Sequence, residues 1–151
     1  MPFGRRYFHN LPIRAAAGAF ILNSGVTKLT ADEAGLEHVY STAITAYPFL
    51  ESIGSANFGK LLGLYETTVG SALLAPFVSD SKAGAFMLPL AAGLVGLYLK
   101  IPGMRRQGSL RPSSQGIPMA KDSWLLAIAI SLLISKPGNN NSHRTQAIVT
   151  D

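Results

Sequence analysis

Four polar residues lie inside otherwise apolar stretches, and their types could hold a proton, an ion or a polar ligand. Arg14, Asn23 and Lys28 belong to the first apolar stretch of the chain, and Glu66 belongs to the second. A charge at membrane depth costs at least about 2.5 kcal/mol on insertion scales, so it usually faces a partner or a water-filled cavity. The four residues therefore define a candidate intramembrane polar site.

The spacing of these residues predicts how they meet. Glu66 lies six residues beyond Lys60, which is about 9 Å along a helix, and Asn23 falls at a matching depth in an antiparallel neighbour. Arg14 and Lys28 share a helix face, because fourteen residues make nearly four turns. If that face meets Glu66, the carboxylate pairs with Lys28 or accepts a hydrogen bond from Asn23. Such a pair could fix helix register or form a proton or ligand site, whereas Arg14 is expected to be a snorkelling end anchor.

Other kinds of chemistry find no support in the sequence. The chain has no cysteine, which excludes disulfides, iron–sulfur clusters and thiolate zinc sites. The three histidines are too far apart in the sequence to match a metal-binding spacing, and they are His9, His38 and His143. Glycine-rich phosphate loops and nucleophile elbows are also missing from the sequence. We therefore predict no catalytic residues, no metal site, no intrinsic cofactor and no enzymatic activity of the chain itself.

Composition and hydropathy predict the elements that position the polar residues. Only 14% of the residues are charged, against about 25% in typical soluble domains. Four apolar segments span residues 11–29, 58–78, 83–100 and 119–135. Backbone groups in hydrocarbon must pair within the protein, which leaves helices as the spanning structure for segments of this length. The expected fold is all-α: a polytopic four-helix transmembrane bundle formed by residues 1–136, multi-pass in the cell membrane.

The segments between these helices have distinct compositions. Residues 30–57 are predicted to be a partly helical excursion at the membrane interface, interrupted by Pro48. Residues 101–118 form a polar, basic loop rich in proline and glycine, and residues 137–151 are expected to be a flexible tail. The basic residues lie at the edges of apolar segments, so the lipid bilayer and its phosphate headgroups, not nucleic acid, are the expected anionic partner.

Small residues recur at helical spacing inside two of the apolar segments. They occupy every fourth position of the second segment (Gly59, Gly63, Thr67, Ser71) and two positions of the third (Ala92, Gly96). Ridges of small residues let membrane helices approach closely, so we expect helix contacts there. The alternative is that glycine is simply commoner in membrane helices.

Two stretches resemble the DoxX family of small bacterial membrane proteins. RAAAGAFILNSGVTKL (14–29) and LLGLYETTVGSALLAP (61–76) carry R-x3-G, G-x2-K and then E-x3-G with a following LL. The resemblance covers residues 11–101, and AKDSWLLAIAISLL is similar to the fourth helix of actinobacterial members. It implies a four-helix bundle in the bacterial plasma membrane, with the polar positions of the family at Arg14, Lys28 and Glu66.

The resemblance also implies a function. The family name comes from a subunit associated with a terminal quinol oxidase, and some members are linked to membrane oxidoreductase assemblies. We therefore expect a non-catalytic accessory subunit of a membrane redox or respiratory assembly, or a helical bundle that binds a quinone or a lipid. Two alternatives remain open: a small proton-coupled transporter using Glu66, and a soluble helical domain, which the shortness of the neutral runs favours.

Overall fold

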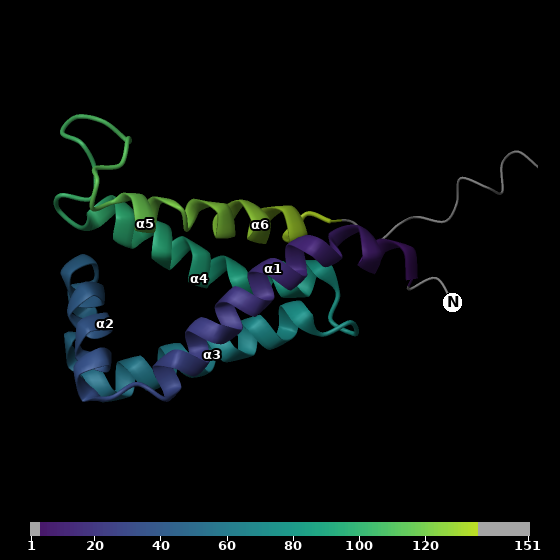
Figure 1. The fold of residues 1–151 in the computed structure, drawn as a ribbon, viewed down its shortest axis with the longest axis horizontal. Coiled ribbons are helices and arrows are strands. Elements are labelled where there is room, and N and C mark those ends of the chain that lie inside the picture. The colour runs from purple at the N-terminus through teal and green to yellow at the C-terminus, as the bar shows by residue number, and fades with distance from the viewer. Residues whose placement is uncertain (1–3, 136–151) are drawn as a thin grey trace, which may run out of the picture.

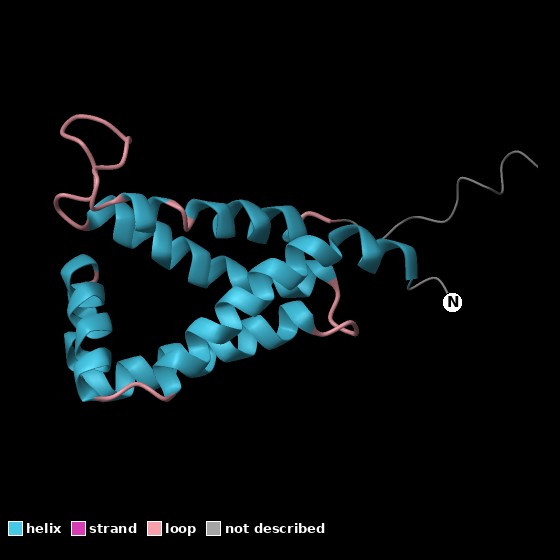
Figure 2. Ribbon diagram, in the orientation of Figure 1, coloured by secondary structure: helices cyan, strands magenta, loops and turns pink. Residues whose placement is uncertain are grey.

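A computed structural model describes residues 4–135, and these residues are arranged as helices joined by loops and turns, with no β-strand among them (Figure 2). The elements are α1 (Gly4–Leu29), α2 (Glu33–Ala46), the 3-10 helix η1 (Pro48–Ser52), α3 (Ser55–Leu74), α4 (Asp80–Lys100), α5 (Ile117–Ala120) and α6 (Ser123–Leu133). The all-α prediction is confirmed for this part of the chain. The predicted flexible tail, residues 137–151, lies outside the described residues.

The helices form two closely packed pairs. α1 packs along α3, and α4 packs along α6. In Figure 1 the two pairs converge near residues 75–80 and diverge toward the opposite end, where α2 lies. α2 contacts both α3 and α4 and so links the two pairs at their open end. The buried apolar core contains residues of α1, α3, α4 and α6, among them Ile21, Val69, Met87 and Leu132.

Glycines set the closest approach between α1 and α3. A Cβ atom added to Gly25 would lie 2.5 Å from the backbone nitrogen of Thr67, and one added to Gly70 would lie 2.6 Å from that of Leu22. A Cβ on Gly63 would lie 3.0 Å from the carbonyl oxygen of Gly25. The predicted contact through small residues is therefore present at Gly63 and Thr67.

At the other positions the small-residue prediction is confirmed in part, since Gly59 contacts Leu36 of α2, whereas Ser71 and Ala92 are exposed. Ser71 is exposed, because the buried face of α3 follows Gly63 and Gly70 instead. In α4 the close contact with α6 lies at Gly84, where an added Cβ would be 2.5 Å from the Leu133 nitrogen. Gly96 makes room for Tyr47, the residue after α2, whose hydroxyl donates a 3.0 Å hydrogen bond to the Gly93 carbonyl.

Several helix boundaries differ from the predicted ones, and prolines explain part of the difference. α1 begins at Gly4, before the predicted residue 11, and includes Pro12. α3 ends at Leu74 instead of 78, since Pro76 lacks the N–H that a continued helix needs. α4 begins at Asp80 and has Pro89 inside it.

The fourth predicted segment, 119–135, is divided into two helices. α5 ends at Ala120 and α6 begins at Ser123, with a turn at Lys121 and Asp122 between them. The basic loop consequently ends at Gly116, because α5 begins at Ile117. With 11 residues, α6 is about 16 Å long, roughly half the thickness of a hydrocarbon core.

Within the described residues, α4 alone has both the length and the apolar composition needed to cross a membrane. Its 21 residues extend about 31 Å, which matches a hydrocarbon core of about 30 Å. α1 and α3 are long enough but carry charged side chains, and α6 is too short. By length and composition, α4 is therefore able to cross a membrane.

The predicted excursion at residues 30–57 is partly helical. α2 starts at a capped end, where the Asp32 side chain accepts a 2.9 Å hydrogen bond from the Gly35 backbone nitrogen, a typical N-cap interaction. The helix ends at Ala46, two residues before Pro48, and η1 follows. Leu36 of α2 packs onto Gly59 of α3. The location of this segment at a membrane interface stays a prediction.

Candidate intramembrane polar site

Arg14 is the most fully bonded polar side chain of the bundle. It is 1% exposed, and its guanidinium group lies where α3 ends and α4 begins. It donates hydrogen bonds 2.7–3.0 Å long to the carbonyls of Ala72, Leu73, Ala75 and Val78 and to the carboxylate of Asp80. A guanidinium group has five N–H donors, and here each has an acceptor.

The local structure explains why an arginine is needed there. The last carbonyls of a helix have no intrahelical partner, and the turn after α3 continues with Pro76, which cannot supply an N–H. Arg14 satisfies these carbonyls. Asp80 balances its charge at 2.7 Å, and the other Asp80 oxygen accepts a 2.7 Å hydrogen bond from Asn10. The prediction of Arg14 as a snorkelling anchor was wrong, because the side chain is buried in an ion pair.

The second ion pair joins α1 to the middle of α3. Lys28 Nζ lies 2.8 Å from Glu66 Oε2 and donates a second 2.8 Å hydrogen bond to the Ser24 hydroxyl. Glu66 is 4% exposed. Of the two partners predicted for Glu66, the structure has Lys28. The side chain of Asn23 lies on the exposed face of α1, so it takes no part in this pair.

The four predicted residues therefore do not form one site. Arg14 and Lys28 do share the face of α1 that packs on α3, but Arg14 contacts the C-terminal end of α3 whereas Lys28 contacts its middle. Each makes a separate buried ion pair. Sequence reasoning missed Asp80 and Asn10, because Asp80 falls between the predicted segments 58–78 and 83–100 and is separated from Arg14 by 66 positions.

Asp122 is a further acidic residue that the sequence reasoning did not single out. It occupies the residue before α6 but makes no side-chain capping hydrogen bond. It is partly buried, and the carboxylate of Glu66 acts on it electrostatically. The signal in the sequence was an acid at a helix start, which ordinarily indicates a cap.

The buried polar side-chain atoms of the described residues are satisfied by hydrogen bonds within the chain. No buried side-chain nitrogen or oxygen atom in this part of the chain lacks a hydrogen-bond partner. Residues 4–135 also contain no group of three or more histidine, aspartate or glutamate side chains that could hold a metal ion. Chemically, the arrangement is suited to holding α1, α3 and α4 in fixed register.

Comparisons of the chain with protein-family models, with curated proteins and with solved structures find no match. The resemblance to DoxX proteins accordingly stays a prediction based on the motifs around Arg14, Lys28 and Glu66. Two of these motif residues form the Lys28–Glu66 pair, and the third makes the Arg14–Asp80 pair. Each of these three motif residues therefore takes part in an ion pair.

Glu66→Leu is expected to lower the free energy of unfolding in detergent by about 2 kcal/mol, because it leaves the Lys28 ammonium buried without its carboxylate. Glu66→Gln should lose less, since its amide oxygen still accepts a hydrogen bond from Lys28. Asn23→Leu is the control, and its exposed side chain predicts little change. Thermal unfolding of the purified variants measures the effect, and equal melting temperatures for Glu66→Leu and the wild type would contradict it.

Proposed function

We propose that the chain is an integral membrane protein in which α1, α3, α4 and the α5–α6 unit form a membrane-embedded bundle. The observation that supports this proposal is that polar and apolar side chains are distributed in the opposite way to those of a water-soluble protein. Arg14 and Glu66 are buried, while large apolar side chains on all four units are exposed, namely Phe20 (62%), Leu61 (59%), Phe86 (51%) and Trp124 (69%). Buried charges and broad exposed apolar surface are unfavourable in water. In hydrocarbon surroundings, buried charges and an exposed apolar surface are both favoured.

The ion pairs support this proposal for α1 and α3, whose composition alone is too polar for a span. The charges of Lys28 and Glu66 neutralise each other inside the bundle, as do those of Arg14 and Asp80. Intramembrane charges are tolerated when they face the bundle interior and pair there. The α5–α6 unit, residues 117–133, extends about 25 Å, so it reaches across a thin or locally deformed bilayer.

Alkaline carbonate extraction tests the membrane proposal. An embedded bundle stays in the membrane pellet and is released only by detergent. Release by carbonate alone would instead support the soluble helical domain, in which the same helices bury their apolar faces against one another or a partner.

Within the membrane, we propose a non-catalytic accessory role in a redox or respiratory assembly, or the binding of a quinone or lipid. The two closed ion pairs support a framework protein, since their donors and acceptors are occupied by one another. The redox connection rests on the resemblance to DoxX proteins. The exposed apolar faces of α1, α3, α4 and α6 offer surface to lipid or to neighbouring subunits.

Co-purification tests this role. The chain is extracted from its native membrane in a mild detergent, and the proteins, quinones and lipids that remain bound are identified by mass spectrometry. A stoichiometric oxidoreductase subunit or quinone supports the accessory role. A partner-free bundle without quinone contradicts the redox role and favours transport or lipid binding.

Proton-coupled transport is the alternative, and the position of Glu66 favours it. This buried carboxylate lies 2.8 Å from the Lys28 ammonium group, so two ionisable groups from α1 and α3 meet inside the bundle. Intramembrane acids often mark proton paths. In reconstituted vesicles, Glu66→Gln should abolish proton-coupled flux while the protein remains folded. Normal flux in that variant would exclude the alternative.

A further inference from the structure

The segment between α4 and α5 concentrates positive charge. No aspartate or glutamate occurs between Asp80 and Asp122, whereas the stretch from 100 to 121 carries five cationic residues, Lys100, Arg105, Arg106, Arg111 and Lys121. Lys100 is the last residue of α4, and the other four belong to the loop or to the turn after α5. All five are exposed. Neither ion pair of the described residues uses any of them. Their charge is therefore available to an external anion.

The loop that carries these residues, 101–116, is held by its own hydrogen bonds. The Arg106 nitrogen donates a 3.0 Å bond to the Arg111 carbonyl, and the Ser113 hydroxyl donates a 2.6 Å bond to the Gly103 carbonyl. The Tyr98 hydroxyl of α4 donates a 2.6 Å bond to the Leu110 carbonyl, which ties the loop to the helix. A preformed loop loses less conformational entropy when it binds a ligand.

Two adjoining cavities lie beside this loop. The first, about 480 Å³, is lined by the last residues of α4 and by loop residues that include Arg105 and Arg106. The second, about 290 Å³, is mainly apolar and lies between α4, the loop and α5, against Val95 and Met119. Leu99 and Leu110 line both cavities. A cationic cavity thus continues into an apolar one.

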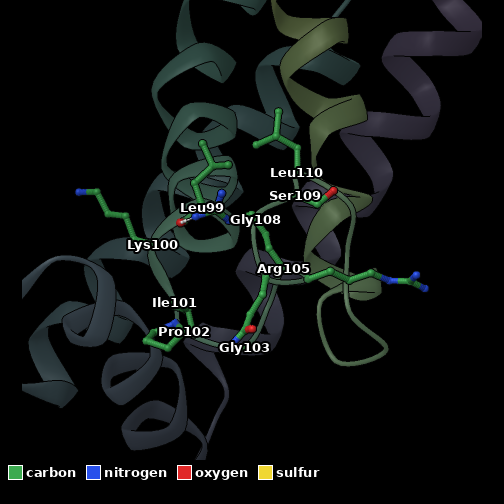
Figure 3. Close-up of a pocket in the computed structure, with 11 residues that line it drawn as sticks. Leu99, Lys100, Ile101, Pro102, Gly103, Arg105, Gly108, Ser109 and Leu110 are labelled. Atoms are coloured by element: carbon green, nitrogen blue, oxygen red, sulfur yellow. Dashed lines mark hydrogen bonds between the residues drawn. The ribbon is translucent and has the colours of Figure 1, made fainter.

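The arginines of the first cavity differ in what they already bind. Arg105 donates a 3.0 Å hydrogen bond to the Leu99 carbonyl at the end of α4, drawn as a dashed line in Figure 3. This bond fixes its guanidinium group at the cavity. The Arg106 side chain makes no hydrogen bond with another described residue. Lys100 extends away from the loop in Figure 3, and its Nζ atom lies 4.2 Å from the ring centroid of Tyr47, between α2 and η1.

We infer that this end of the molecule binds an anionic phospholipid, with the headgroup phosphate at Arg105 and Arg106 and an acyl chain against the apolar cavity. The inference rests on the proposed membrane location. Arginine donates paired hydrogen bonds to phosphate oxygens. A free phosphate ion would use only the first cavity, whereas a lipid uses both. Leu110 and Trp124, 72% and 69% exposed, lie where apolar and aromatic residues contact the interfacial region of a bilayer.

Lipid binding to the full-length chain in detergent tests the inference, with phosphatidylglycerol and phosphatidylcholine as probes and native mass spectrometry as readout. The wild type should prefer phosphatidylglycerol. Each cation near an anionic lipid contributes roughly fivefold in affinity, so Arg106→Gln should weaken phosphatidylglycerol binding about fivefold and Arg105→Gln/Arg106→Gln about 25-fold. Lys82→Gln/Lys60→Gln removes the same charge from exposed positions outside the loop and should leave binding within about twofold.

Further measurements distinguish a phospholipid from a free phosphate compound as the ligand, and they test whether the positive charge of the arginines determines the lipid preference. Glycerol phosphate, which has the headgroup without acyl chains, should compete weakly with the lipid, and Leu110→Ser should weaken lipid binding while leaving glycerol phosphate binding unchanged. Arg105→Lys/Arg106→Lys keeps the charge and should restore most of the preference. Equal binding of the two lipids by the wild type, or equal loss in the Lys82→Gln/Lys60→Gln control, would overturn the inference. Because the probes are added in detergent, that result leaves carbonate resistance, and with it the membrane proposal, unaffected.

Discussion

Arg14→Leu is expected to lower the free energy of unfolding by about 3–5 kcal/mol, the range observed when one partner of a buried ion pair is removed. The loss has two parts. Asp80 loses its cation, and the four carbonyls of residues 72, 73, 75 and 78 lose their donors in an apolar environment. Leucine fills much of the space but offers no hydrogen bond. Thermal or denaturant unfolding of the purified chain in detergent measures the change.

Arg14→Lys is the matched control for charge. A lysine keeps the cation, but its three donors cannot replace five directed hydrogen bonds, so an intermediate loss is expected. Asp80→Asn keeps an oxygen acceptor and should lose less than Arg14→Leu. If Arg14→Leu and the wild type unfolded at the same temperature, the junction of α3 and α4 would not depend on this side chain.

Gly25→Val is expected to cost about 2–3 kcal/mol through overpacking of the α1–α3 contact. The atoms that a Cβ would meet are backbone atoms, with the Thr67 nitrogen at 2.5 Å and the Gly63 oxygen at 2.7 Å. Backbone cannot rotate away as a flexible side chain can, so the two helices must separate. Lys28 lies one turn further along α1, so its 2.8 Å contact with Glu66 should lengthen as well.

Gly93→Ala is the control for changing a helical glycine. An added Cβ there meets nothing within 4 Å, and alanine has the higher helix propensity, so stability should stay equal or rise by up to about 1 kcal/mol. Thermal unfolding of the Gly25→Val and Gly93→Ala variants in the same detergent gives the comparison. Similar losses in both would indicate that helix propensity, not close packing, determines the result.

Periodicity predicted the contact between α1 and α3 because it depends on positions within single helices. Fourteen residues return to the same face of a helix, so Arg14 and Lys28 both face α3, and the choice of partner for Glu66 was reduced to two residues. Whether Lys28 or Asn23 faces Glu66 depends on the rotation of α1 about its axis. The glycines at 25 and 70 fix that rotation through backbone contact.

The role of Arg14 could not be read from the sequence, because its partners are defined by tertiary structure. Four of its five acceptors are backbone carbonyls, which carry no sequence signal, and the fifth belongs to a residue 66 positions away. The division of the fourth segment was missed for a similar reason. Hydropathy measures the apolar character of a window, but the turn at Lys121 and Asp122 interrupts the backbone without ending the apolar stretch.

The bonding of Arg14 has a consequence for the order of events during synthesis. The arginine leaves the ribosome long before its acceptors, which follow it by 58 to 66 positions. At about 5–20 residues per second, the interval before Asp80 appears is roughly 3 to 13 s. During that time the nascent first helix carries an uncompensated guanidinium group. A chain that stops after α3 would never acquire the carboxylate, so such a truncated product should be degraded faster than the full-length chain.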